Sequence, residues 1–305
     1  MTTTTAVAMR QVTAPKALRQ PSHSPVWEIW LGLRRSPSGM VGLSIVIIHL
    51  VIALISPFVV PYEPAAFDTS AIRAAPSAEH FFGTDKLGRD VFTRTLLGGR
   101  VALVITIAAT FLAMFWGGLV GITVGYLGSW ADQIVMRLVD AVLAVPRLLI
   151  LLLVASIFGT GTTVLIPALG FLSGVAVIRI ARAATLDFVS RDFIVAAYAI
   201  GARKRRIILR ELLPNVLDLL MVEGALRWSW MLLTFSALSF LGFGVAPPTP
   251  DWGLMIANSR DVLMLAPWAT FFPILAISTL VVGVNLFAGA LAKAIGLDRG
   301  GRVTG

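Results

Sequence analysis

The chain has 305 residues, of which 57% are hydrophobic and only 13% charged, and its mean hydropathy is +0.87. The surface of an ordinary soluble protein needs far more charge, so this composition excludes a water-soluble globular protein. The absence of cysteine excludes disulfides and thiolate metal sites, and we read the net charge of +9 as basic loops of a membrane protein, with no nucleic-acid partner.

The first hundred residues divide into three segments. Residues 1–38 are polar and basic and lack a signal peptide, which predicts a cytoplasmic N-terminal tail with an interfacial helix around Trp27 to Leu33. Residues 39–60 predict the first transmembrane helix, which ends before Pro61. The polar residues 61–100 then predict an extracytoplasmic segment.

Five further apolar stretches approach the roughly 20 residues that a helix needs to cross a bilayer. They run from about Val101 to Val124, Val139 to Phe158, Val164 to Ala184, Val216 to Phe243 and Ala269 to Ala292. We therefore expect an all-α membrane protein of six transmembrane helices. Residues 101–292 form a five-helix core with a cytoplasmic loop at 185–215, and residues 293–305 form a cytoplasmic tail.

The distribution of lysine and arginine predicts the orientation. With the N-terminus inside, the inner segments hold eighteen of these residues and the outer segments hold six. Positively charged loops stay on the cytoplasmic side, so we expect both termini to be cytoplasmic.

The inner loop contains a short helix with a predicted docking function. Ser190 is a plausible N-cap and Gly201 a plausible C-terminal glycine. Between them, the apolar face comprises Phe193, Ala196, Ala197 and Ile200. Such a helix suits a groove on a partner protein. The alternative is an amphipathic helix on the inner leaflet, with the basic run 203–206 near anionic lipids.

Four sequence stretches indicate a family. In the inner loop, Ala196-Ala197, then Gly201, then Pro214 resemble the EAA signature of ABC importer permeases. Residues 82–90 (FGTDKLGRD), 125–130 (GYLGSW) and 237–253 (ALSFLGFGVAPPTPDWG) match the order of the dipeptide, oligopeptide and nickel permease family. The chain is therefore similar to the DppC/OppC-type subunit of that family.

The resemblance implies a type I, MetI-like permease in a bacterial cell membrane. Such a subunit forms half of the path for di- and oligopeptides delivered by an extracytoplasmic binding protein; nickel complexes or haem-like solutes are the alternative cargo. It implies a second, DppB-like permease and one or two DppD/DppF-like ATPases as partners. The chain lacks a phosphate-binding Gly-xxxx-Gly-Lys-Ser/Thr motif, so we expect no enzyme activity and no cofactor in it, with ATP and Mg bound by the ATPases.

By the same resemblance, the ATPase contacts fall on six residues of the inner loop and its C-terminal edge. They are Asp192, Ala196, Ala197, Gly201, Arg205 and Pro214. The chain departs from the family at Val195, which occupies the position of the motif glutamate. A charge contact at that position is therefore either absent or supplied by Asp192 or Arg191.

Candidates for the translocation path lie on the fifth and sixth predicted spans. Glu223 and Arg227 are four residues apart, and Arg227 is about 18 Å along the helix from Asn215. Ionisable residues at that depth line a path or form a neutralised pair against a neighbouring helix. Trp230 and Asn285 complete the candidate path.

The second outer loop contains a candidate contact for the binding protein. Asp251 and Trp252 come directly after a proline-rich turn at 247–250. A stiff turn with its tryptophan anchored at the membrane interface explains the same pattern.

Two other classes of membrane protein compete with this interpretation. A secondary transporter would use an acidic residue such as Glu223 for ion coupling. A membrane enzyme would need a base beside a nucleophile such as Ser239, for which only His49 is a candidate.

Overall fold

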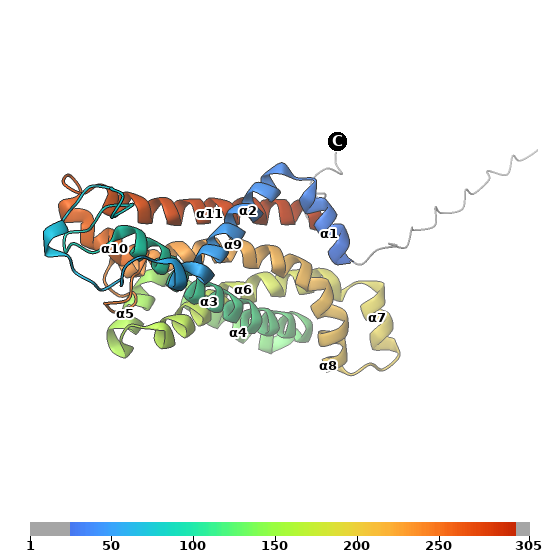
Figure 1. Cartoon of the computed structure of the whole chain (residues 1–305). Helices are drawn as coiled ribbons and strands as arrows, with labels where there is room; N and C mark the ends of the chain where they lie inside the picture. The colour runs from blue at the N-terminus through green and yellow to red at the C-terminus, as the bar shows by residue number, and fades with distance from the viewer. Residues whose placement is uncertain (1–24, 297–305) are drawn as a thin grey trace, which may run out of the picture.

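The computed structural model describes residues 25–296. The parts of the two predicted tails at 1–24 and 297–305 lie outside the described residues. The predicted interfacial helix corresponds to α1, Pro25–Arg34, which lies against the last helix, α11, in Figure 1.

The described part of the chain is built of helices and contains no strand. After α1 come α2 (Pro37–Val59), α3 (Val91–Leu127), α4 (Ser129–Leu143), α5 (Arg147–Phe158), α6 (Thr162–Val189), α7 (Asp192–Ala199), α8 (Lys204–Arg206), the π-helical turn η2 (Ile207–Leu212), α9 (Leu213–Phe240), α10 (Trp252–Ser259) and α11 (Trp268–Ile295). Short 3-10 turns lie at Thr69–Ala71 and Arg260–Val262.

Four of these helices, α2, α3, α6 and α11, are long and apolar enough to cross a membrane. The bent pair α4–α5 counts as a fifth span if its two halves are taken together. The remaining predicted span corresponds to α9, whose 28 residues include the charged Glu223 and Arg227 and so have a lower hydropathy. The prediction of an all-α membrane protein is confirmed.

Two predicted boundaries of the spans differ from the structure. The second predicted span begins at Val101, but α3 begins at Val91, because Asp90 caps the helix by accepting a hydrogen bond from the Thr93 N–H at 2.7 Å. The third predicted span, 139–158, is interrupted by a bend of 82° between α4 and α5. Pro146 adopts a non-helical conformation there and has no N–H with which to continue the ladder.

The helices form an elongated bundle whose two ends are easily recognised (Figure 1). The segment after α2 and α10 lie at one end, and α7 and α8 lie at the opposite end. These are called the α10 end and the α7 end below.

The most extensive helix contact within residues 25–296 joins α3 and α6 along a row of glycines. Gly117, Gly121 and Gly125 are spaced four residues apart on α3 and face α6. A Cβ atom at Gly121 would lie 2.5 Å from the Ile178 carbonyl oxygen, closer than any real contact of this kind. Small residues at this spacing allow two membrane helices to approach closely, and here they bring the two backbones together.

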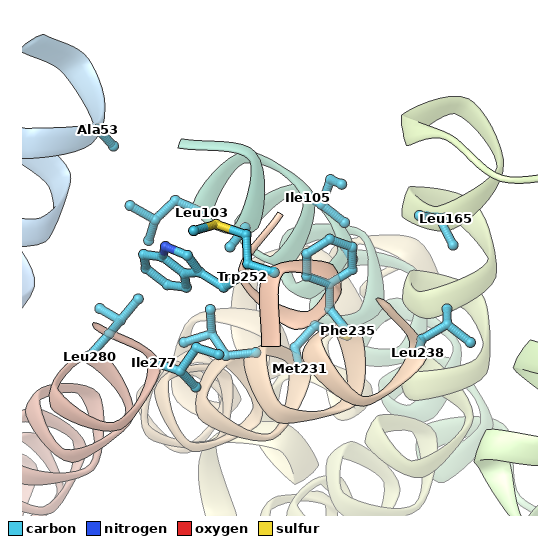
Figure 2. Close-up of a cluster of buried hydrophobic side chains, with 14 of the residues drawn as sticks. Ala53, Leu103, Ile105, Leu165, Met231, Phe235, Leu238, Trp252, Ile277 and Leu280 are labelled. Carbon is cyan, nitrogen blue, oxygen red and sulfur yellow. The ribbon is translucent and has the colours of Figure 1, made fainter. Parts of the chain in front are cut away.

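Apolar side chains form two separate clusters, one towards each end of the bundle. Figure 2 shows the cluster nearer the α10 end, where Trp252 lies among Leu103, Ile277 and Leu280. The cluster at the α7 end joins α3, α6, α7, η2 and α9. It comprises Ile122, Val177, Ala181, Ala184, Ile194, Ile207, Leu212, Val216 and Leu220, and is called the α7 cluster below.

The glycine contact predicts a strong effect of a single methyl group. Gly121→Ala should lower the free energy of unfolding by roughly 1–3 kcal/mol, because the new Cβ pushes on the α6 backbone, which cannot move aside. Gly289→Ala on α11 is the matched control, since nothing lies within 4 Å of its Cβ position, and a helical alanine there should be neutral or stabilising. Thermal unfolding of the detergent-solubilised chain measures both; equal melting temperatures for the two variants would contradict the prediction.

Candidate functional site

The short helix α7 ends at a glycine in a well-defined cap. Gly201 has a φ of +76°, a left-handed conformation that glycine adopts without strain. The Gly201 N–H donates to the Tyr198 carbonyl at 3.0 Å and the Ala202 N–H to the Ala197 carbonyl at 3.1 Å. These two bonds are those of a Schellman motif, and they confirm the predicted helix end. The predicted N-cap is wrong: Ser190 is the C-cap of α6, and Arg191 precedes α7 without a side-chain cap.

Both sides of α7 are apolar, and they have different surroundings. Ile194 is 3% exposed and belongs to the α7 cluster. Val195, Tyr198 and Ile200 are exposed, Ile200 to 84%. Of the four residues in the predicted apolar face, only Ala197 packs against the α7 cluster. The side chain of α7 that is buried in this cluster is Ile194, which the predicted face did not include. The helix therefore joins the bundle through one side and presents apolar groups outward on the other.

The predicted ATPase-contact residues gather at the α7 end. Asp192, Ala196, Gly201, Arg205 and Pro214 are exposed, and Ala197 is half-buried. Val195, at the position of the family's glutamate, lines a depression of about 350 Å³ with Tyr126, Tyr198 and Lys204 among its other walls. The surface at that position is therefore an apolar side chain beside a lysine.

A π-helical turn connects α8 to α9. In η2 the Leu213 N–H bonds to the Ile208 carbonyl, five residues back, just before Pro214, which has no N–H to donate. The wider turn places Ile207 and Leu212, five residues apart, in the same buried cluster. Residues 204–240 thus form an uninterrupted run of helical turns with an extra residue in one turn.

Near the middle of the bundle, the candidate path residues form a charged group. Arg227 bonds to Glu223 one turn earlier, with Nε 2.9 Å from Oε1, so the predicted pairing is confirmed. The Arg227 Nη1 also lies 3.4 Å from the Ser173 carbonyl on α6. Both side chains of the pair are mostly buried.

The structure adds a second arginine, Arg147, to this group. Arg147 is the first residue of α5, and its Nη1 lies 3.4 Å from the Ser173 hydroxyl. Arg147 and Arg227 therefore meet at the same residue of α6. Pro146 signals the helix break that brings Arg147 here, but only the bend itself shows which helix its side chain faces.

The two other candidates for the path lie apart from each other. Trp230 is one turn beyond Arg227 and is 63% exposed, so it extends the same stripe of α9. Asn285 on α11 donates to the Ser229 hydroxyl at 2.8 Å. Ser229 is two positions from Arg227 and hence on a different side of α9, so the structure does not bring Asn285 together with the charged group.

Two ion pairs fasten α4 to α6 between the charged group and the α7 end. The Arg179 Nη2 lies 2.5 Å from the Asp140 Oδ1, and the Arg182 guanidinium makes two hydrogen bonds to the Asp132 carboxylate. Each of these arginines has a carboxylate partner on α4, which neutralises its charge.

The predicted binding-protein contact needs correction. Asp251 is fully buried and Trp252 is 3% exposed, so their side chains are not on a surface that a delivery protein could touch. Asp251 caps α10 through the Gly253 N–H at 2.9 Å and accepts the Ser239 hydroxyl at 2.6 Å. The Trp252 indole N–H donates to the Thr95 carbonyl at 2.7 Å. This hydrogen bond joins α10 to α3.

Comparison with protein families gives two matches, which cover separate parts of the chain. Residues 117–297 match the model of the binding-protein-dependent transport system inner membrane component. Residues 24–76 match the N-terminal TM domain of oligopeptide transport permease C.

Curated relatives match over nearly their full lengths. The chain is 34% identical to a glutathione transport system permease protein GsiD from Shigella dysenteriae, over 92% of both chains. It is also 34% identical to a dipeptide transport system permease protein DppC from Alkalihalophilus pseudofirmus, over 89% of this chain and 90% of that one. A di/tripeptide transport system permease protein DppC from Pseudomonas aeruginosa shares 34% identity, with 89% and 92% covered.

The buried Asp251 predicts a pH dependence. Burial raises the pKa of the Asp251 carboxyl above its ordinary value of 3.8. The folded protein therefore holds this proton more tightly than the unfolded chain does. Its free energy of unfolding is highest below the unfolded-state pKa of Asp251 and falls as the pH rises through the folded-state pKa. Asp251→Asn removes this titration, so the melting temperature of the variant relative to the unmodified chain should rise as the pH increases above about 4.

The control for this measurement is Asp261→Asn. The exposed Asp261 accepts a hydrogen bond from Lys86, which lowers the pKa of its carboxyl. Any contribution of Asp261 is complete above its unfolded-state pKa, so this variant should show no trend above about pH 5. A melting-temperature difference for Asp251→Asn that stays constant with pH would refute the prediction.

Proposed function

Because the chain belongs to the family of binding-protein-dependent transport system inner membrane components, we propose that it forms half of the path through which an ATP-driven importer carries short peptides. It is a permease subunit of an ABC importer of the dipeptide and glutathione type. The relatives named above are permeases for glutathione, dipeptides and di- or tripeptides. These cargoes are all short peptides, which supports peptide as the substrate class here.

The observation that carries the proposal is the position of Ile194. This one side chain of α7 is buried in a cluster with residues of α3, α6, η2 and α9. The opposite side of α7 is exposed and apolar, as a helix needs to be in order to enter a groove on another protein. A force applied to α7 from outside the chain would therefore reach three long helices through direct packing.

We infer the assembly from this arrangement and the family. The α7 end faces the cytoplasm, with both termini on that side, and an ATPase subunit docks on α7. A second, related permease completes the path, and a binding protein delivers peptide at the α10 end. ATP and Mg are bound by the ATPases. Closure of the ATPases shifts the helices between two packed arrangements, one open to each side of the membrane.

Removing the buried contact of α7 tests this coupling. Ile194→Ala leaves a cavity in the α7 cluster, a change that typically costs about 2–5 kcal/mol of packing, so the movement of α7 should be transmitted poorly. Uptake of a labelled dipeptide per ATP hydrolysed should fall severalfold in vesicles that contain the complete transporter. Ile48→Ala is the matched control, because Ile48 on α2 is 55% exposed.

Three measurements decide the outcome. Copurification of the ATPase with each variant shows whether the assembly is intact, and ATP hydrolysis and uptake are then measured on the same vesicles. An unchanged ratio of uptake to hydrolysis in Ile194→Ala would contradict the role of α7. Uptake that continues without ATP and depends on an ion gradient would overturn the ABC importer mechanism itself.

A further inference from the structure

Arg147 lies where a lone cation is difficult to accommodate. Its guanidinium contacts Ser173, the twelfth of the 28 residues of α6, and the side chain is half-buried. Within residues 25–296, no carboxylate lies within salt-bridge distance of Arg147. An unpaired charge well inside a membrane bundle is costly and typically marks a functional position.

The charge of the neighbouring groups does not compensate for Arg147. Arg227, at the same Ser173, is paired with Glu223, so the group holds two guanidinium groups and one carboxylate. Two other sets of charged groups on α4 and α6, Asp140 with Arg179 and Asp132 with Arg182, pair with each other. The site around Ser173 therefore has a net charge of +1.

The start of α5 adds to this positive potential. The first N–H groups of a helix lack partners within it and form the positive end of its dipole. No side chain caps α5, whose N-cap residue is Pro146, and a cation as its first residue is electrostatically unfavourable unless an anion is near. Broken transmembrane helices of transporters use such N-termini to bind anionic groups of their substrates.

The position along the membrane suits a substrate in transit. Arg227 is the fifteenth of the 28 residues of α9, so it lies about 20 Å from either end of that helix. Glu223, Arg227, Trp230 and Thr234 succeed each other at helical spacing on one stripe of α9, and Trp230 is exposed at its centre.

We propose that Arg147, together with Arg227 and the N-terminus of α5, binds a carboxylate of the peptide midway through the membrane. The inference rests on the proposed function and names the part of the substrate that this site takes. A planar guanidinium offers two parallel N–H donors that match the two oxygens of a carboxylate. Every unmodified short peptide carries one carboxylate at its C-terminus, and acidic peptides carry a second one on a side chain, which is the carboxylate that we assign to this site.

The test compares the uptake of peptides that differ in charge. Arg147→Gln removes the unpaired cation and keeps a polar side chain of similar length. Vesicles or cells with the complete transporter are given labelled Ala-Glu, Ala-Ala or Ala-Lys at concentrations that saturate the binding protein, so that its own preference does not set the rate. Uptake of Ala-Glu should fall roughly tenfold or more, the factor expected for one charge-assisted hydrogen bond. Ala-Ala should be affected less and Ala-Lys least.

Two further arginine variants serve as controls. Arg137→Gln removes the same charge from an exposed position on α4 and should leave the uptake of all three peptides unchanged. Arg147→Lys retains the cation, so it should keep the order of preference of the unmodified transporter.

Glu223→Gln tests the proposal in the opposite direction, which matters if Arg147→Gln fails to assemble. It removes the carboxylate that pairs with Arg227, so the site gains positive charge, and uptake should shift towards Ala-Glu relative to Ala-Lys. An unchanged ratio of these two rates would overturn the site.

The outcomes separate this inference from the proposed function. If the unmodified transporter moves peptides with ATP but Arg147→Gln lowers all three rates equally, or lowers none, Arg147 has only a packing role and the carboxylate site is wrong. If the unmodified transporter moves none of these peptides, both proposals fall together.

Discussion

The close approach of α3 to α6 is the contact on which the rest of the structure depends. Lipid tails are as apolar as leucine side chains, so membrane helices gain little from burying apolar surface and must associate through close packing. Gly117, Gly121 and Gly125 allow the α3 backbone to contact α6 directly. The same α6 provides Ser173 to the two arginines, is fastened to α4 by two ion pairs, and leads into α7. A well-defined position of α6 thus sets the position of both candidate sites.

Features that depend on local chemistry and composition could be predicted from the sequence. Apolar stretches identify the spans, Gly201 predicts the end of α7, and the four-residue spacing predicts the Glu223–Arg227 pair. Side chains whose environment depends on distant parts of the chain were not predictable. The sequence predicts Asp251 and Trp252 to be surface residues of a polar loop. Both are buried instead, because the Asp251 carboxylate bonds to the Ser239 hydroxyl and the Trp252 indole N–H bonds to the Thr95 carbonyl. The contact of Arg147 with α6 likewise depends on the bend between α4 and α5, which the predicted continuous span 139–158 does not contain.

A single helix, α6, joins the α7 cluster to the charged group around Ser173. Ser173 and Ala184 lie on the same helix, eleven residues or about 16 Å apart, and Ala184 belongs to the α7 cluster. In the mechanism proposed above, a displacement of α7 moves α6 and thereby the carbonyl and hydroxyl that orient Arg227 and Arg147. Motion driven at the α7 end would change how tightly a carboxylate is held in the middle of the membrane, without a separate signalling route.

The π-helical turn before Pro214 has a consequence for how the loop can vary. Its extra residue keeps Ile207 and Leu212 on one buried side, while Lys204, Arg205 and Arg206 directly precede it in α8. Deleting one residue within 207–212 would preserve the apolar character of the segment but rotate the basic triplet by about 100° about the local helix axis. The direction in which the three positive charges point is thus fixed by the number of residues between the triplet and the proline, more than by the identity of those residues. The length of the segment sets the orientation of the charges around the helix.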